Sequence, residues 1–143
     1  MEVSYVRKRV REAMERARRR TGERRTRNDE ATREYEAFLE RIAVPLFRQI
    51  GNVLRAEGYT FTVSTPGGGV RLASDRSGGD YLELRLDTES GTPQVMLHSS
   101  RGRGRRVIDS ETAIGAAGAA IASLSEEDVL VPVLAELEPF VER

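Results

Sequence analysis

The chain lacks cysteine and tryptophan altogether, and it holds one histidine, His98, and one lysine, Lys8. Without cysteine it can form no disulfide, thiolate metal site or cysteine nucleophile, which is typical of the reducing cytoplasm, where we expect this protein to act. A lone imidazole cannot supply a histidine cluster for zinc, and nothing near it supports a Ser-His-Asp constellation. We therefore expect no metal site, no cofactor and no catalytic residues, and we interpret His98 as a solvated side chain.

Long apolar runs are missing too. No stretch approaches the roughly 20 consecutive apolar residues that a membrane-spanning helix needs. The first 20 residues also lack the apolar core of a secretory signal. With 143 residues, 38% hydrophobic and 32% charged, the chain is the size and composition of one globular domain with a polar appendage, and we expect no membrane partner.

A formal net charge of zero conceals a strong asymmetry along the chain. Residues 1–27 hold eleven basic and four acidic side chains, a net charge of +7. Residues 107–143 hold one basic and eight acidic side chains, a net charge of −7. Such segregation bears on partners and association rather than on how the core packs.

Residues 1–28 are predicted to form a basic, Arg-rich helical arm. Apolar residues recur there at alternating spacings of three and four, which places them in one narrow seam along a helix over residues 3–20. Thr21 and Gly22 are expected to end that helix. A seam this thin predicts a helix that is marginal alone, so it should be frayed or pressed against something else. The residues of this candidate assembly seam are Val3, Val6, Val10, Ala13 and Ala17.

A second helix is predicted from near Asn28 or Asp29 to Gly58, and Pro45 should kink or split it. From residue 59 onward apolar and polar residues alternate, which is the pattern of half-buried strands. In the first turn between strands, Pro66 should preset the first central dihedral and Gly67 should take the positive φ of a type II turn. Four strands are expected, at residues 59–65, 70–74, 81–87 and 94–100, or five with residues 105–111.

The alternation separates two faces of this sheet. The inner face is predicted to carry Phe61, Val63, Val70, Leu72, Leu82, Leu84, Leu86, Val95 and Leu97. The outer, solvated face is predicted to carry Thr60, Thr62, Arg71, Tyr81, Glu83, Arg85, Asp87, Met96 and His98. Because one face is apolar and the turns are short, we expect an antiparallel meander covered by helices on one face only.

A last helix should begin after Ser125, since the following acids Glu126, Glu127 and Asp128 suit a capped start at the positive end of the helix dipole. Pro132 predicts a bend or a late start. Its apolar face is predicted to hold Val129, Leu130, Val133, Leu134, Leu137, Phe140 and Val141. The fold class is therefore α+β: a four- to five-stranded antiparallel meander in the order α-β-β-β-β-(β)-α, forming one two-layer domain over residues 29–143 after the basic arm.

The stretch HSSRGRGRR, residues 98–106, admits two interpretations. Arginines separated by glycines can hold single-stranded nucleic acid in a flexible segment. Strands flank this single copy, however, and no aromatic residue is interleaved, so we favour a strand-to-strand crossing in which Gly102 and Gly104 supply unusual dihedrals. Its candidate phosphate-contacting side chains are Arg101, Arg103, Arg105 and Arg106, together with Arg18, Arg19, Arg20, Arg24 and Arg25 of the arm.

Two catalytic alternatives carry little weight. TPGGGVRL resembles a phosphate loop only superficially, because a strand follows its glycines and the one lysine lies elsewhere. A nuclease site could be built from Asp75 or Asp80 with Glu83, but the base beside them would be Arg85, which does not give up a proton near neutral pH. Cleavage of DNA or RNA is therefore not expected.

These observations favour a non-enzymatic binding or assembly module that acts through protein contacts. We expect an oligomer in which the basic arm docks on protein, either another copy or a second subunit. The alternative is an accessory protein that binds DNA or RNA through the Arg-rich arm and the RGRGRR segment.

Overall fold

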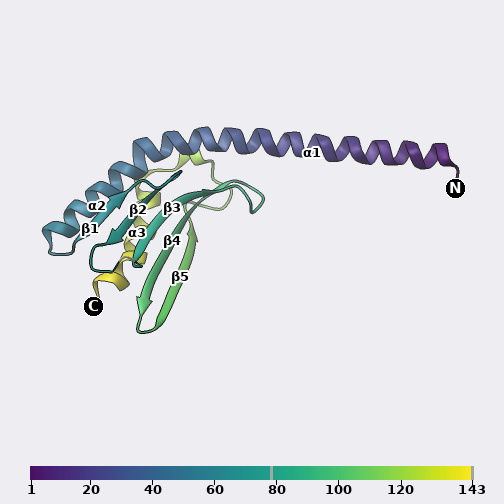
Figure 1. Ribbon diagram of the computed structural model, residues 1–143. Helices are drawn as coiled ribbons and strands as arrows, with labels where there is room; N and C mark the ends of the chain where they lie inside the picture. The colour runs from purple at the N-terminus through teal and green to yellow at the C-terminus, as the bar shows by residue number, and fades with distance from the viewer. Residues whose placement is uncertain (78, 143) are drawn as a thin grey trace.

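The computed structural model describes residues 1–77 and 79–142. The N-terminal part of the chain is a long rod, built from α1 (Val3–Phe38), the π-helical turn η1 (Leu39–Ala43) and α2 (Val44–Ala56). A sheet, a 3-10 turn η2 (Ile121–Ser123) and the helix α3 (Glu126–Val141) follow. The strands are β1 (Phe61–Ser64), β2 (Gly69–Ser74), β3 (Tyr81–Asp87), β4 (Gln94–Arg103) and β5 (Arg106–Ala113). Figure 1 shows the rod extending well beyond the body.

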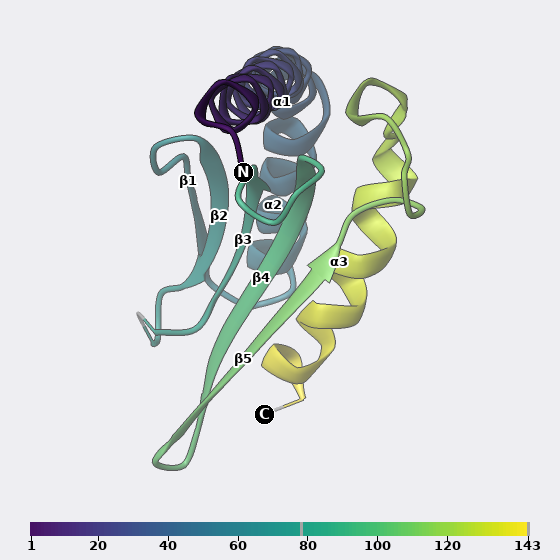
Figure 2. The ribbon, with the colours of Figure 1, turned by 90° about the vertical axis from the view of Figure 1, so that its right-hand side faces the viewer.

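The sheet is an antiparallel meander in the order β1-β2-β3-β4-β5. Helix α2 packs against β1 and β2, whereas α3 packs against β3 and β4. Figure 2 shows the two helices side by side on one face of the sheet. The predicted α+β architecture with a helical arm is therefore confirmed, including the fifth strand.

The inner face of the sheet follows the predicted alternation. Strand pairing places Leu72 opposite Leu82 and Leu84 opposite Leu97, so that leucines meet across three neighbouring strands. Phe47 of α2 is fully buried with them. Of the nine residues predicted to point inward, Val63 and Leu86 are half-buried and the remaining seven are buried.

The first turn of the sheet lies one residue later than predicted. The Gly69 amide donates to the Pro66 carbonyl at 2.8 Å, so Pro66 begins the turn instead of occupying its first central position. Gly68, not Gly67, takes the positive φ, at +79°. A Cβ on Gly69 would lie 2.6 Å from the Leu84 carbonyl oxygen, so β2 and β3 approach closely only because this residue has no side chain. The next predicted turn, residues 75–80, includes Gly78, which lies outside the described residues.

The expected helix break at Thr21 and Gly22 is wrong, because α1 runs without interruption through both and through Asn28 and Asp29. The Thr21 hydroxyl donates back to the Ala17 carbonyl at 3.0 Å, so this residue stays within the helix. One glycine costs a helix only about 1 kcal/mol relative to alanine. The packed end of α1 supplies the costly nucleus, and extension from it is comparatively easy.

Pro45 divides the rod as predicted. The chain widens into the π-helical turn just before it, where the Val44 amide donates to the Leu39 carbonyl. Pro45, which has no N–H to donate, then lies in the first turn of α2. Figure 1 shows the rod bending at this point.

At the other end, α3 has the expected cap. The Asp128 amide donates to the Ser125 hydroxyl oxygen and the Ser125 amide donates to the Asp128 carboxylate. The late start suggested by Pro132 is wrong, since α3 begins at Glu126 and holds Pro132 in its interior. Leu134, predicted on the apolar face, instead points to solvent.

Replacing Leu84 by Asp should lower the free energy of unfolding by more than about 3 kcal/mol, because it buries an unpaired carboxylate at the centre of the apolar face. Val107 on β5 is 67% exposed and provides a matched control, since Val107→Asp adds the same carboxylate in water. Denaturant titration compares the two. Equal tolerance of both substitutions would contradict the assignment of faces.

Candidate functional site

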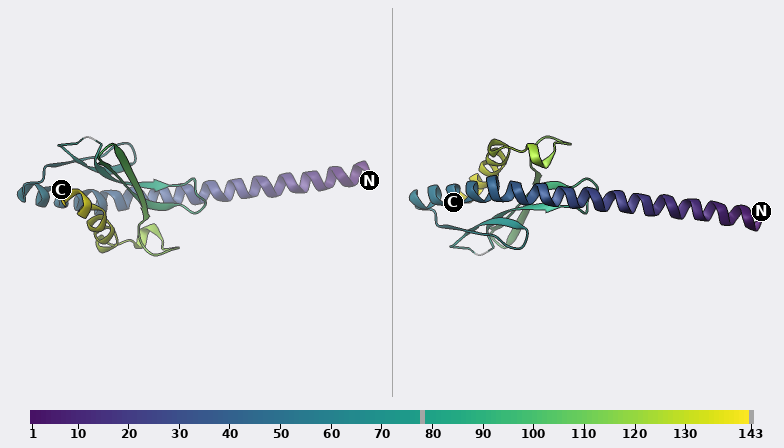
Figure 3. Two further views of the ribbon diagram at one scale, coloured as in Figure 1. Left: turned by 90° about the horizontal axis from the view of Figure 1, so that it is seen from below. Right: turned by 90° about the horizontal axis from the view of Figure 1, so that it is seen from above.

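The N-terminal part of α1, residues 3–27, is an arm that contributes nothing to the core. Every residue from 1 to 27 is exposed except the half-buried Glu12. Figure 3 shows this part of the helix continuing in line with its packed end, away from the sheet. The predicted assembly seam lies along it uncovered: Val3 is 72% exposed, Val6 42% and Val10 51%, and Ala13 and Ala17 are exposed as well.

The arm is anchored by the last third of α1. Ala31, Tyr35 and Phe38 are buried there, and the Tyr35 hydroxyl donates to the Gly68 carbonyl at 2.7 Å. Burial, with a smaller contribution from the nearby Glu83 carboxylate, raises the pKa of the Tyr35 phenol above its ordinary value. The phenol is therefore a neutral hydrogen-bond donor at physiological pH, and it fixes α1 to the turn between β1 and β2.

The uncovered seam and the anchoring stripe share a seven-residue spacing, which one charged residue interrupts. Val3, Val10 and Ala17 are spaced by seven, the exposed Arg24 takes the next position, and the buried Ala31 and Phe38 resume the count. A straight helix drifts by about 20° per heptad, so the seam turns gradually away from the side that packs on the body. Apolar residues at such spacing are typical of helices that pack against another helix.

The candidate phosphate-contacting arginines of the arm, Arg18, Arg19, Arg20, Arg24 and Arg25, are all exposed. Within the described part of the chain none of the five forms a salt bridge. Arg9 is the paired arginine of the arm: it lies 3.8 Å from Glu12 and donates to the Tyr5 hydroxyl at 2.9 Å. The arm thus offers free positive charge over a large part of its circumference.

The segment RGRGRR forms a tight hairpin between β4 and β5, as the strand-to-strand interpretation predicted. Arg103 pairs with Arg106, and Gly104 takes a φ of +64° between them. Gly102 needs no special dihedral; it lies within β4, and its amide donates to the Asp80 carboxylate at 2.8 Å. Arg103, Arg105 and Arg106 are exposed at the tip and Arg101 is half-buried. Figures 1 and 2 show the tip pointing away from α1, so the two basic segments do not form one surface.

The outer face of the sheet neutralises its own charges. Glu83 was predicted to be solvated there, but it is only 4% exposed. Its two carboxylate oxygens lie 2.8 Å from Nε of Arg71 and 3.1 Å from Nε of Arg85. The Arg71 guanidinium also lies over the Tyr81 ring, 4.1 Å from its centroid. Long side chains thus cover a carboxylate that no helix covers.

His98 is not the solvated side chain that the sequence suggested. Only 15% of its side chain is exposed, and its ring centroid lies 5.7 Å from that of Tyr81. Its Nε2 is 3.4 Å from an Asp109 oxygen and its Nδ1 is 3.6 Å from a Glu111 oxygen. Strand register explains the placement, since Glu83, His98 and Glu111 are paired neighbours across β3, β4 and β5.

A second polar cluster lies under α3 and was missed by sequence reasoning. The Glu136 carboxylate accepts hydrogen bonds from the hydroxyls of Ser99 at 3.0 Å and Ser110 at 3.1 Å, with Thr112 at 3.4 Å. Helical spacing could have predicted that Glu136 faces the sheet, because it lies on the same side of α3 as the buried Val133 and Phe140. His98 precedes Ser99 on β4 and points to the opposite face of the sheet, so no imidazole reaches these hydroxyls.

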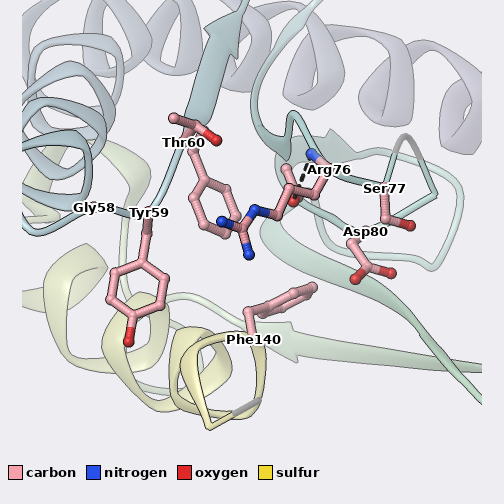
Figure 4. Close-up of a pocket in the computed structure, with 9 residues that line it drawn as sticks. Gly58, Tyr59, Thr60, Arg76, Ser77, Asp80 and Phe140 are labelled. Atoms are coloured by element: carbon pink, nitrogen blue, oxygen red, sulfur yellow. Dashed lines mark hydrogen bonds between the residues drawn. The ribbon is translucent and has the colours of Figure 1, made fainter.

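A pocket of about 120 Å³ opens between the 58–61 segment, the turn after β2 and the end of α3. The rings of Phe61 and Phe140 meet edge to face in its wall, with centroids 6.4 Å apart. Figure 4 shows the Arg76 side chain extending toward the space between Tyr59 and Phe140. The pocket is smaller than the roughly 300–1,000 Å³ typical of sites for organic ligands.

Across residues 1–77 and 79–142 no group of three or more His, Asp or Glu side chains gathers as metal ligands would. The helices in this part of the chain are all too short or too polar to cross a membrane. Comparison with protein families, curated proteins and solved structures gave no match. The arm, the hairpin tip and the charged faces of the body are therefore the features from which a function can be argued.

Replacing Glu83 by Gln should lower the free energy of unfolding by about 1–3 kcal/mol, because it removes the buried charge that Arg71 and Arg85 share. Glu89→Gln, at an exposed position in the turn after β3, is the matched control and should change little. Thermal or denaturant unfolding measures both. An effect of Glu83→Gln no larger than that of the control would show that the network does not stabilise the fold.

Proposed function

We propose that this protein is a non-enzymatic assembly module whose rigid N-terminal arm docks on another protein subunit, with a second copy of the chain as the first choice of partner. The observation that carries the proposal is the uncovered seam of Val3, Val6, Val10, Ala13 and Ala17 on a helix that is anchored to the body only by its far end. The body serves as the scaffold that holds the arm out.

The continuity of α1 supports this function. A flexible basic tail would suit a phosphate backbone, whereas a helix already formed presents its apolar residues in one fixed row. Ordering such a segment costs free energy on binding, and an arm that is helical before it binds avoids most of that cost. The seam therefore has a rigid support for packing against a protein surface.

The distribution of charge supports a partner of the same sequence. The arm segment, residues 1–27, carries a net charge of +7 and residues 107–143 carry −7. Opposite charges of this size steer association and fix its geometry more than they add to affinity. Each copy of the chain thus carries a basic segment and an acidic segment that can attract the opposite segments of another copy.

Nuclease-treated protein should be oligomeric, and deletion of residues 1–27 should reduce its mass to that of a monomer. Changing both Val6 and Val10 to Gln should weaken the assembly by at least about tenfold, because it removes two apolar contacts of roughly 1 kcal/mol each or more. Glutamine favours a helix at least as well as valine, so the arm itself should remain helical. Analytical ultracentrifugation over a range of concentrations measures the change.

Lys8→Gln with Arg19→Gln is the matched control for the valine pair, since it alters two exposed residues on the opposite side of the arm. A parent protein that stays monomeric at all concentrations would refute the assembly function. An oligomer that is insensitive to the valine changes would show that the seam is not the contact.

The alternative function is nucleic-acid binding, and a specific observation favours it. Arg18, Arg19 and Arg20 are exposed without acidic partners in the described structure, and the hairpin tip presents Arg103, Arg105 and Arg106 on a fixed turn. Both features could neutralise phosphates of DNA or RNA.

Under this alternative, affinity for DNA or RNA should fall steeply with salt, and changing Arg18, Arg19 and Arg20 to Gln should reduce the slope of log Kd against log salt by roughly 2 to 3 units. Fluorescence anisotropy with a labelled duplex and a labelled single strand gives that slope. Loss of binding in the arginine variant, combined with an unchanged mass in the Val6→Gln/Val10→Gln variant, would replace the assembly function by this one. A slope that does not respond to the arginine changes would exclude it.

A further inference from the structure

The outer side of α3 is an apolar and acidic face that nothing in the described structure covers. Val131 is 57% exposed and Leu134 is 45% exposed, and both lie on one stripe of the helix with Ala135. Glu127 lies on the same stripe toward the beginning of the helix, and Glu138 and Glu142 lie on it toward the end. All three acids are exposed. Residues 126–142 contain no basic side chain.

This face is the chemical complement of the arm. The seam of the arm offers valines and alanines flanked by Arg7, Arg9 and Arg16, whereas α3 offers Val131 and Leu134 flanked by acids. The body exposes other large apolar residues, but none of them lies in a stripe of three acids: Val53 has one acid, Glu57, a helical turn further on, Tyr59 follows that same acid by two residues, and Val107 follows Arg106. The greater negative charge around Val131 and Leu134 therefore favours α3 as the contact for a basic arm.

The two surfaces also match in length. The seam from Val3 to Ala17 covers about 21 Å, and the stripe from Glu127 to Glu142 covers about 22 Å, at about 1.5 Å of rise per residue. Ala13 and Ala17 on the arm and Ala135 on α3 are small enough for the two helices to approach closely.

The ends of the helices fix the direction of packing. Glu138 lies in the last turn of α3 and Glu142 follows as its C-cap, where the negative end of the helix dipole disfavours acids. The first turn of α1 holds no acid, and the side chain of the N-cap Glu2 makes no capping hydrogen bond at this positive end. Antiparallel packing places the beginning of α1, with Arg7 and Arg9, beside Glu138 and Glu142, so the unfavourable charge at the end of α3 meets its opposite.

The arm of the same chain cannot reach this face. Helix α1 is continuous from Val3 to Phe38 and leads away from the body, so folding the arm back onto α3 would require the helix to break. Building on the assembly function proposed above, we propose that the outer face of α3 is the docking site for the N-terminal arm of a second copy of this chain, packed antiparallel to α3.

Charge reversal on each side of the contact tests this docking. One variant carries Arg7→Glu and Arg9→Glu, a second carries Glu138→Arg and Glu142→Arg, and a third combines all four changes. Acids near the start of α1 and bases at the end of α3 both suit the helix dipole, so each variant should stay folded, which circular dichroism checks. The control, Lys8→Glu with Arg19→Glu, makes the same change in net charge on the opposite side of the arm.

Sedimentation velocity should show each two-residue variant self-associating at least about tenfold more weakly than the parent, because like charges then face each other. Mixing the two variants should restore assembly, since each arm then meets an opposite charge, and the four-residue variant should assemble alone. Val131→Gln with Leu134→Gln should weaken assembly as strongly as the changes to Val6 and Val10. The control should stay close to the parent.

These outcomes distinguish failure of the docking site from failure of the assembly function on which it rests. If the α3 variant assembles like the parent, or if mixing restores nothing, the docking site is wrong, while loss of assembly on deleting residues 1–27 would still support the arm as the contact. If the parent is monomeric at every concentration, the assembly function fails and the docking site fails with it.

Discussion

The packing of the last third of α1 on the sheet is the contact on which the rest of the molecule depends. Ala31, Tyr35 and Phe38 are buried. The Tyr35 hydroxyl donates a hydrogen bond to the carbonyl of Gly68, which lies 33 positions later in the sequence. Because that contact fixes one end of the helix, the residues before it extend an existing helix instead of nucleating a new one. The arm therefore leaves the body as the continuation of a packed helix, and its exposed valines lie in one row along that helix.

Covering only one face of the sheet creates a second constraint, because the outer face must satisfy its own charges. Glu83 does so by lying between Arg71 and Arg85, and His98 lies between Asp109, Glu111 and the Tyr81 ring. Charge that is internally compensated in this way contributes little to binding a partner. The uncompensated charge lies elsewhere: basic on the arm and the hairpin tip, acidic on α3. The charge on which the proposed contacts depend thus lies at the ends and flanks of the molecule.

Periodicity in the sequence predicted the sheet well, because alternation of apolar and polar residues has one physical cause, a half-buried face. Apolar residues at helical spacing also led to the candidate seam, which lies exposed along α1, and its role in assembly stays a prediction. Periodicity failed to predict the features that depend on contacts between residues far apart in the sequence. Thr21 and Gly22 looked like a helix end because nothing local shows that Tyr35 anchors the helix further on, and Glu83 and His98 looked solvated because burial by neighbouring arginines and Tyr81 depends on strand register. The sequence also did not predict the exposed stripe of α3. The spacing of Leu134 is compatible with the apolar face, and only the packing of the helix shows that this side chain faces solvent.

A thin seam on a rigid arm has a consequence for the proposed assembly. Three valines and two alanines bury little surface, and exposed ion pairs add at most about 1 kcal/mol each, so one docked arm forms a weak and salt-sensitive contact. Each chain, however, carries one arm and one acidic α3 face. When two copies exchange arms, the second docking is intramolecular and gains the high effective concentration of a linked pair. Rigidity is what makes that gain available, because a helix that already points in a fixed direction loses little freedom when its partner closes the pair.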